Sequence, residues 1–474
     1  MILILAGTAV WFQRDIPLSH PEYWLDLDLE GNGPFSAGAS KISITPSIGD
    51  DKEVWLAGYH VGRAATGVHD DLWARAVVIR CGEVTIALVA LDLIGIFLAE
   101  VISIRKALDG EIDYVIVAST HTHSGPDTMG LWGPTRFRTG VREKYQEKVR
   151  GAVIRAIREA ASRLEPSSLV FARRDLAPRG LLRDSRKPIV MDTELSVCAI
   201  HPRAGGDAIA TLVNWSCHPE VMDSKNTLIS SDFPHYLREA MENGIPEENL
   251  LGTGGVCLFL SGSIGGLQTP LRVDVTDRKG QLQEEASFEK AKVLGENLAA
   301  EALRALQSSG RILITEGPLR VSARTALVPL QNLAFRAASK LGVIRRGSTR
   351  GRKARTEVGL LELGDVPLLL IPGEIYPEIV VGGIESPRGQ DFSVAPVEVP
   401  PLKQALGGKV RFLIGLANDE IGYLIPKSEW DDSAPYLYGA EKSPYGEINS
   451  PGPDAAQIIH REALYHIRRR ETGR

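Results

Sequence analysis

The sequence predicts a mixed α/β fold arranged in several layers, and two kinds of segment support this class. Short continuous apolar runs, DYVIVAST (113–120) and GVCLFLSG (255–262), suit strands that are buried on both faces. A longer segment, 140–163, carries apolar residues at helical spacing together with i,i+4 charge pairs. Strands and helices follow one another in an irregular order, which favours one large multilayered domain over a regular barrel.

The other elements are expected from the same periodicities. The runs WARAVVIR (73–80) and EVTIALVALDLIGI (83–96) predict two strands joined by a tight turn at Cys81 and Gly82. No fixed repeat period stands out along the chain. Further strands are expected at 195–200, 208–216, 318–324, 356–363, 366–372 and 409–416, and helices at 98–109, 233–243, 282–306 and 452–470.

The composition is that of an ordinary globular protein. Of 474 residues, 43% are hydrophobic and 24% are charged, and the mean hydropathy is -0.05. The net charge of -5 gives no electrostatic reason to bind nucleic acid, so we expect no nucleic-acid partner. Each of the four cysteines lies in or beside an apolar run and none has CxxC spacing, so we expect buried free thiols and no thiolate zinc site.

The N-terminal segment differs from the rest of the chain. Residues 1–12 (MILILAGTAVWF) are apolar, but a membrane-spanning helix needs about 20 such residues, and a signal peptide would begin with a basic stretch. Residues 31–38 (GNGPFSAG) are typical of a loop. We therefore expect an apolar arm and linker over residues 1–36, which could be a truncated signal or anchor, and one folded domain over residues 37–474.

Four short stretches each place a good metal ligand just after an apolar strand, where functional side chains are commonly assembled. The stretch VIVASTHTHSGPD carries His121 and His123, which on an extended backbone would point the same way and line one cavity. His218 follows in LVNWSCHPEVM, Glu374 in PLLLIPGEIYPE and Tyr423 in RFLIGLANDEIGYLIP. Each has a structural alternative when it is taken alone: a polar loop, a core histidine, a charge at a helix N-terminus or a packed tyrosine.

Taken together and in this order, THTHSGPD, NWSCHPEVM, IPGE and NDEIGY resemble four signature stretches of the neutral ceramidase family. GVHDDLWARAVVI, around His69 and Arg75, is similar to an early segment of that family, so the resemblance runs from about residue 37 to residue 460. It implies a mixed α/β catalytic domain, which in the family is followed by a small immunoglobulin-like domain. Because this chain ends at Arg474, we expect the catalytic domain only.

The resemblance also implies a zinc site (Zn2+). In the family, the first histidine of HTH, the histidine after Asn-Trp, the glutamate of Pro-Gly-Glu and a downstream tyrosine hold the ion. These match His121, His218, Glu374 and Tyr423 here. The second histidine of HTH lies beside the metal in the family, so His123 is expected to be a catalytic group next to the ion.

Two further family residues contact the substrate. A tyrosine in a Tyr-Glu-containing stretch has its best match in Tyr445, within SPYGEINSPGP. An arginine near the scissile amide corresponds either to Arg183 or to Arg186, within LLRDSRKP. The resemblance does not choose between these two arginines.

One departure from the family concerns a serine. The family carries Gly-Asp-Val-Ser-Pro-Asn after a buried strand, and that serine has a catalytic or substrate-contacting role. The matching stretch here is FLSGSIGGLQTP. If Gly262 aligns with the family glycine, Ser263 replaces the aspartate and Gly265 replaces the serine. We therefore do not expect a serine-based covalent route, and ceramide itself is only one candidate substrate.

The resulting expectation is a zinc-dependent hydrolase that cleaves an amide, such as an N-acyl sphingolipid, or an ester with a metal-activated water. His123 would polarise the carbonyl or transfer a proton, and Tyr445 would donate to the oxyanion. Asp232 is a candidate acceptor for a ligand imidazole, or else the N-cap of the helix that starts at Phe233. The basic run 340–355 suggests contact with a membrane surface, or else a solvated loop.

Other interpretations remain open at this point. The chain could be a different HxH metallohydrolase, although the HxHxDH pattern of metallo-β-lactamase-like enzymes is not in register here. It could also be a non-catalytic lipid-binding protein on a ceramidase-like scaffold, which the missing serine and the basic run would suggest. The resemblance favours a secreted, periplasmic or membrane-associated location without excluding the cytoplasm, and the oligomeric state is not predicted.

Overall fold

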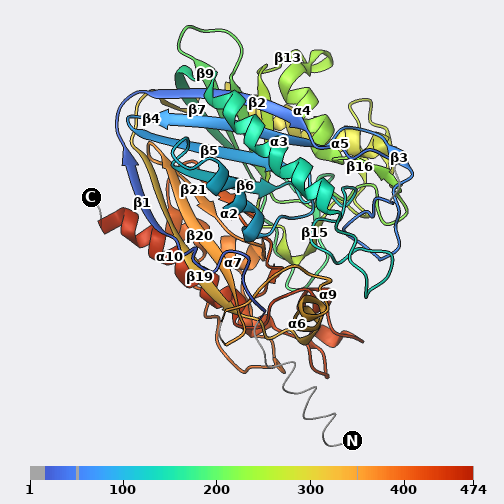
Figure 1. Ribbon diagram of the computed structural model, residues 1–474. Coiled ribbons are helices and arrows are strands. Elements are labelled where there is room, and N and C mark those ends of the chain that lie inside the picture. The colour runs from blue at the N-terminus through green and yellow to red at the C-terminus, as the bar shows by residue number, and fades with distance from the viewer. Residues whose placement is uncertain (1–15, 50–52, 350, 473–474) are drawn as a thin grey trace, which may run out of the picture.

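In the computed structural model, two β-sheets pack face to face and helices cover both outer sides (Figure 1). The structure describes residues 16–49, 53–349 and 351–472. The apolar run expected over residues 1–12 lies outside these ranges. Within the part of the chain that the structure describes, none of the helices combines the length and the apolarity needed to span a bilayer.

The larger sheet has nine strands and carries the first half of the chain. Its pairs are mostly antiparallel, but β5 runs parallel to β6 and β10 runs parallel to β14. In their order across the sheet the strands are β14 (Val256–Ser261), β10 (Ala210–Trp215), β9 (Glu194–Pro202), β7 (Glu165–Asp175), β2 (Phe35–Ser43), β4 (Trp73–Cys81), β5 (Val84–Leu91) and β6 (Tyr114–Ser119), and β18 (Ile312–Ile314) pairs with β7.

The smaller sheet has five strands and comes mainly from the second half of the chain. Its last pair, β21 with β23, is parallel, and the other pairs are antiparallel. In their order across the sheet the strands are β1 (Asp26–Gly31), β19 (Leu319–Pro329), β20 (Lys353–Leu363), β21 (Val366–Leu370) and β23 (Phe412–Ile414).

Side chains from both sheets interlock to form the central core. Phe35 and Phe171 of the larger sheet and Phe412 of the smaller one are fully buried in it. Figure 1 shows helices on the outer faces, which makes four layers. The larger sheet is covered by α2 (Leu98–Ala107), α3 (Glu143–Ala161), α4 (Phe233–Asn243) and α5 (Phe288–Gln307), and the smaller sheet by α7 (Pro377–Val381), α8 (Leu402–Leu406) and α10 (Ala455–Thr472).

Short elements at the ends of the sheets position the loops that matter for function. Three of these pairs join segments that are far apart in sequence: β8 with β15, β3 with β11 and β22 with β24. The short strands are β3 (Gly67–Val68), β8 (Arg183–Asp184), β11 (Leu228–Ile229), β12 (Gly244–Ile245), β13 (Leu250–Leu251), β15 (Gln268–Thr269), β16 (Val275–Thr276), β17 (Leu282–Gln283), β22 (Glu374–Ile375) and β24 (Tyr423–Leu424). The short helices include α6 (Leu333–Lys340) and α9 (Tyr445–Ile448).

The layered α/β class predicted from the sequence is therefore confirmed, with one correction at the start of the domain. The folded region does not begin near residue 37. Strand β1 pairs with β19 along its whole length, and β2 starts at Phe35, so the expected linker already belongs to the sheets. The glycines of GNGPFSAG had indicated a loop, but the loop occupies only the few residues between two strands.

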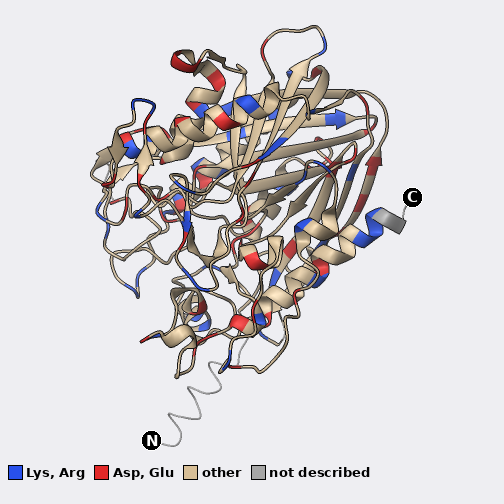
Figure 2. Ribbon diagram, turned by 180° about the vertical axis from the view of Figure 1, so that it is seen from behind, with Lys and Arg blue, Asp and Glu red and all other residues tan. Residues whose placement is uncertain are grey.

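The four cysteines are buried and form no disulfide, as their apolar surroundings predicted. The basic run 340–355 is divided, with Arg345, Arg352 and Lys353 exposed and two other arginines turned inward. Arg346 forms an ion pair with Asp419 at 2.5 Å, and Arg355 is 5% exposed and donates to the carbonyl oxygen of Tyr23. These two arginines hold neighbouring segments together and are not available to bind a lipid headgroup. Figure 2 shows acidic and basic residues interspersed over the rear face of the molecule.

Candidate metal centre

Three histidines converge at the ends of β6 and β10. His121 and His123 follow β6, and His218 follows β10, so both loops leave the same sheet. Backbone hydrogen bonds fix these loops: the His121 amide donates to Leu93, the His123 amide to Pro219 and the His218 amide to Gln268, at 2.9, 3.1 and 2.9 Å. The imidazoles are thus carried on a rigid backbone, which is what a preorganised site requires.

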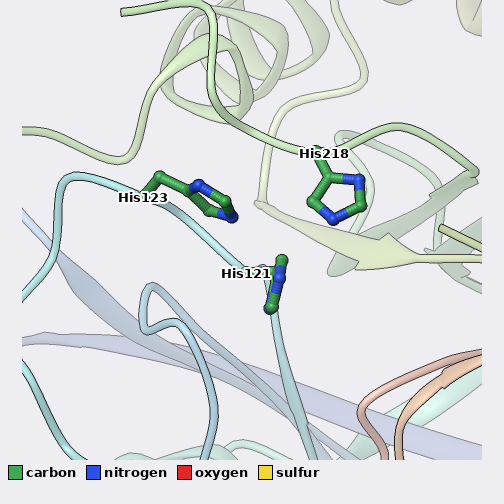
Figure 3. A group of neighbouring side chains, drawn as sticks. All are labelled: His121, His123 and His218. Carbon is green, nitrogen blue, oxygen red and sulfur yellow. The ribbon is translucent and has the colours of Figure 1, made fainter. Parts of the chain in front are cut away.

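The three imidazole rings point toward a common centre in edge-to-face arrangements (Figure 3). The ring centroids of His121 and His123 are 5.1 Å apart, those of His121 and His218 also 5.1 Å, and those of His123 and His218 5.6 Å. One nitrogen from each ring lies within 4.8 Å of the others, which is close enough to hold a single metal ion. The expectation that an extended backbone directs both HxH side chains is wrong, because His121 adopts a φ of 70°. The left-handed turn at His121 brings the two rings together instead.

Glu374 and Tyr423 approach the histidines from a separate two-stranded sheet, formed by segments that follow β21 and β23 of the smaller sheet. They are direct register partners in the parallel pair of β22 with β24, so their backbones lie side by side. One carboxylate oxygen of Glu374 lies 2.9 Å from His218 Nε2 and 3.4 Å from His121 Nε2. Tyr423 is 4% exposed and lines the same cavity. His121, His218 and Glu374 are therefore gathered around one point, and Tyr423 lines the cavity above them.

The protonation of the two imidazoles indicates that a cation belongs between them and Glu374. His121 Nδ1 lies 2.6 Å from the carbonyl oxygen of Ile94, and His218 Nδ1 lies 2.8 Å from that of Gln268. A carbonyl oxygen only accepts, so both Nδ1 atoms carry protons, and in a neutral ring Nε2 then presents a lone pair. Two lone pairs aimed at a carboxylate oxygen repel it unless a proton or a metal ion lies between them. The donor set therefore fits a divalent metal.

His123 is the least satisfied polar group of the site. It is 8% exposed, and neither of its ring nitrogens has a hydrogen-bond partner among the described residues. Burial, together with the nearby His121 and His218, holds the pKa of His123 well below its usual range, so the ring is neutral. Gly58 covers this ring so closely that an added Cβ would lie 2.5 Å from its Cγ atom. A buried, neutral imidazole without hydrogen bonds is ready to bind a ligand or accept a proton.

Two residues beside His123 were not identified from the sequence. A carboxylate oxygen of Glu220 lies 3.3 Å from His123 Nδ1, and the Tyr59 hydroxyl donates to the same oxygen at 3.0 Å. The Tyr59 and His123 rings meet edge to face with centroids 5.0 Å apart. The position of Glu220, two residues after His218, was the only feature of the sequence that could have indicated its place in the site. No feature of the sequence indicated Tyr59.

A cavity of about 970 Å³ opens over this centre. Tyr445, on α9, has its ring centroid 6.2 Å from that of Tyr423. Of the two candidate arginines, Arg183 lines the cavity and Arg186 does not. Arg186 is buried, pairs with Glu447 at 2.7 Å and lies over the ring of Tyr376. The residues of the site that line the cavity are His121, His123, Arg183, His218, Glu374, Tyr423 and Tyr445.

Asp232 does not support a ligand imidazole. Its carboxylate accepts from the backbone amides of Phe233, Val221 and Met222, so it caps α4 and ties the preceding loop to it. The acceptors for His121 and His218 are the backbone carbonyls of Ile94 and Gln268 instead. The N-cap alternative for Asp232 is therefore confirmed.

The structure also shows why the serine-bearing stretch differs from the expected pattern. At Gly265 an added Cβ would lie 2.4 Å from a ring carbon of Tyr376 and 2.7 Å from the carbonyl oxygen of Glu374, so no side chain fits. Ser263 is fully buried and donates to Asp192 at 2.7 Å, away from the cavity. Neither position presents a hydroxyl to the histidines.

The fold and the site define a four-layered α/β protein with a buried histidine–carboxylate centre suited to a transition metal. Comparison with known proteins names the family. The model of neutral/alkaline non-lysosomal ceramidase, N-terminal, matches residues 35–267. Neutral ceramidase of Pseudomonas aeruginosa is 25% identical over 372 residues, which cover 74% of this chain and 53% of that protein. Over residues 35–267 the chain matches the neutral/alkaline non-lysosomal ceramidase family, and it spans about half the length of that curated relative.

Solved structures agree at the level of the fold. The crystal structure of neutral ceramidase from Pseudomonas aeruginosa superposes with a TM-score of 0.68 at 19% identity, covering 93% of this chain and 75% of that one. A ceramidase complexed with C2 gives a TM-score of 0.67 at 19% identity, covering 93% of this chain and 76% of that one. The two-sheet architecture is therefore shared with these proteins.

Proposed function

We propose that this chain is a zinc-dependent hydrolase of N-acyl amides. The observation that carries the proposal is the position of Glu374, whose carboxylate oxygen lies within 3.4 Å of two imidazole nitrogens at the floor of a cavity of about 970 Å³. The family match supports the reaction class, since the relatives named above are ceramidases. An N-acyl sphingolipid is one substrate candidate among such amides.

His121, His218, Glu374 and Tyr423 would hold the zinc ion, with His123 beside it. A zinc ion bound there supplies Lewis acidity that polarises a carbonyl and activates water. The backbone carbonyls of Ile94 and Gln268 keep both Nε2 atoms turned toward the centre, and Glu374 adds the negative charge that favours a divalent cation.

The other cavity residues orient the substrate and move protons. His123 is neutral and without hydrogen bonds, so its ring can take a proton from the attacking water and deliver it to the departing nitrogen. Partial burial and the charges of Glu374 and Glu220 raise the pKa of Tyr445 to about 12, so its hydroxyl keeps its proton and can donate to the oxyanion. Arg183 lines the same cavity and would offer its guanidinium to the substrate.

The packing at Gly265 supports a route through water. Because no side chain fits at that position and Ser263 is bound to Asp192, a serine nucleophile from this stretch is not available to the substrate. We further propose that the chain from β1 onward forms one catalytic unit, because both sheets contribute residues to the same centre.

The test combines metal analysis with turnover on the full chain. We expect close to one zinc per chain and chelator-sensitive hydrolysis of N-acyl amides, both abolished in the His121→Ala, His218→Ala double variant. His201→Ala, a histidine at the end of β9, is the matched control and should change neither. Turnover that survives complete metal removal would contradict the proposal. A full complement of zinc without turnover of any amide or ester would favour the lipid-binding alternative.

A further inference from the structure

The cavity over the metal centre has two unlike ends. One end is apolar: Ile94, Phe97, Met129 and Ile344 form a small buried cluster of their own, and Phe335 of α6 packs against it. Leu131 and Trp132 extend the same wall. An end lined in this way suits an alkyl chain, since burial of apolar surface is what makes the chain bind.

The other end of the cavity is charged. It is built from β8 and from the segment that follows β15, and it presents Arg183, Arg272 and Lys290. Lys290 is 2% exposed, and its ammonium donates to the backbone oxygen of Glu284 at 3.0 Å. Arg183 is half-buried, and only its Nε atom is used, in a bond to the carbonyl of Leu271.

Charges of both signs lie at this end, and they differ in burial. Lys290 is buried and Arg183 is half-buried, whereas Arg272 is exposed, and neither arginine forms an ion pair within the described ranges of the chain. Of the acidic residues that line the cavity, Glu284 and Glu285 are exposed, and the buried Glu220 accepts from the hydroxyls of Tyr59 and Thr269. Cations that are partly withdrawn from water and lack a counter-ion favour an anionic ligand.

The histidines lie at the junction of the two ends. His121 is tied through Nδ1 to the carbonyl of Ile94, which belongs to the apolar wall. His218 is tied through Nδ1 to Gln268, in the strand that leads into the charged wall. A scissile amide held at the histidines would therefore have its two substituents in chemically different surroundings.

We infer that the substrate of this site has a single acyl chain and a compact amine portion that carries a carboxylate, as in an N-acyl amino acid. This inference rests on the proposed hydrolase function and specifies its substrate class. The acyl chain lies in the apolar end and the carboxylate meets Arg183, Arg272 and Lys290. Hydrolysis breaks the amide C–N bond, with water giving hydroxyl to the acyl carbon and hydrogen to the nitrogen, so a fatty acid and an amino acid leave.

An amide with two long chains fits this cavity less well. Its second alkyl chain would lie along Arg183 and Lys290 and would remove these cations from water without a partner, which is unfavourable. The charged wall therefore selects against such a substrate as well as for a carboxylate.

The test compares three substrates on the zinc-loaded full chain: N-dodecanoyl-glycine, N-dodecanoyl-ethanolamine and N-dodecanoyl-sphingosine. We expect kcat/KM for the glycine conjugate to exceed that for the ethanolamine conjugate by about tenfold, as for a hydrogen-bonded charge, and the sphingosine conjugate to be poorest. Equal or faster cleavage of the two-chain amide would overturn the inference and leave the hydrolase proposal standing. If the zinc-loaded protein cleaves none of the three substrates, both the substrate inference and the hydrolase proposal are contradicted.

Variants on the charged wall separate recognition from chemistry. We expect Arg272→Met to raise KM for N-dodecanoyl-glycine about threefold and Lys290→Met about tenfold, with little change for the uncharged ethanolamine conjugate. Lys279→Met removes an exposed cation from the same segment outside the cavity and is the matched control. Equal losses on both substrates, or no loss on either, would contradict a carboxylate at this end.

Discussion

Two buried polar clusters of this protein differ in how completely their atoms are paired. In the first, Arg238 and Asp92 are almost fully buried and form two parallel hydrogen bonds of 2.7 and 3.0 Å. Arg238 also donates to the Ser231 hydroxyl, and Asp92 also accepts from the backbone amide of Trp73. In the second, His123 has no hydrogen bond, and Glu374 faces the lone-pair side of two imidazoles.

The difference separates a structural cluster from a functional one. Apart from Arg238 Nε, which has no hydrogen-bond partner, this buried charge pair is complete without any ligand, and its role is to join α4 to the loop after β5. A buried cluster in which His123 has no hydrogen bond and one carboxylate is shared by two imidazoles is suited to an additional cation or substrate. The predictions below test whether the two clusters respond differently when each is perturbed.

The largest effect is expected for Glu374→Gln. We expect this substitution to lower zinc content and to reduce amide hydrolysis by at least about a thousandfold, because a carboxylate ligand is lost from the centre. The metal-free variant should be less stable than the metal-free parent, because His121 and His218 lower the pKa of Glu374 to about 2 and this favourable contact is lost. Zinc analysis, turnover and denaturant unfolding measure the three quantities.

Glu378→Gln provides the control for that experiment. Glu378 is fully buried four residues away, and burial together with Glu429 raises the pKa of its carboxyl well above the usual range. It therefore carries a proton already, and an amide of the same shape should leave both zinc content and turnover unchanged. Equal damage from the two substitutions would mean that Glu374 has no special role.

The next largest effect is expected in the structural cluster. Asp92→Ala should lower the free energy of unfolding by about 3–5 kcal/mol, because Arg238 is left as a buried charge without its partner. The folded fraction should still bind a full complement of zinc. Unfolding in denaturant with excess zinc gives the first value, and metal analysis of the folded protein gives the second.

The double variant Asp92→Ala, Arg238→Met sharpens this prediction. If the loss comes from an unpaired charge, removing the arginine as well should restore a large part of the stability. A double variant that is less stable than Asp92→Ala would show instead that the pair itself contributes the stabilisation.

A smaller effect is expected when the metal is removed from the parent protein. At a free zinc concentration about 100 times Kd, binding adds about 2.7 kcal/mol to the stability, so chelation should lower Tm by a few degrees. Glu374→Gln should show no such shift. A chelator that lowers Tm equally in both proteins would place the bound ion elsewhere.

The smallest effect is expected for Ser263→Ala. Ser263 donates to Asp192, away from the cavity, so its loss should cost about 1 kcal/mol of stability and change turnover by less than about twofold. The turnover of Ser263→Ala is compared with that of Ser185→Ala, because Ser185 lines the cavity. A collapse of turnover in Ser263→Ala would restore the covalent serine route that the packing at Gly265 argues against.

Much of the fold could be predicted because its strands and helices have strong periodicity. FPHYLREAMEN, predicted as a helix, is α4 over the same residues, and the strand pair around Cys81 and Gly82 is β4 with β5. The sheet strands that were missed are β1, β2, β7 and β18. The acidic residues at alternate positions of β1 resemble a polar tail, and β7 ends in charges. Both are held in place by neighbours distant in sequence, which no local pattern reveals.

The candidate site was predictable in its residue types and not in its geometry. The order of the histidine, glutamate and tyrosine stretches pointed to the residues that the structure gathers. The left-handed backbone conformation of His121 could not be predicted from the sequence. The carbonyl acceptors at Ile94 and Gln268 could not be predicted either, because every residue has a backbone carbonyl and the residue type does not identify it. The choice of Arg183 over Arg186 depended on Glu447, far along the chain.

The register that places Glu374 beside Tyr423 has a mechanical consequence. These two residues lie on segments that follow β21 and β23 of the smaller sheet, whereas all three histidines follow strands of the larger one. An ion held by both groups would link the two halves of the sandwich. Separating the two sheets would then require the ion to leave its ligands. Force applied between the sheets should therefore be resisted more strongly by the loaded protein than by the stripped one.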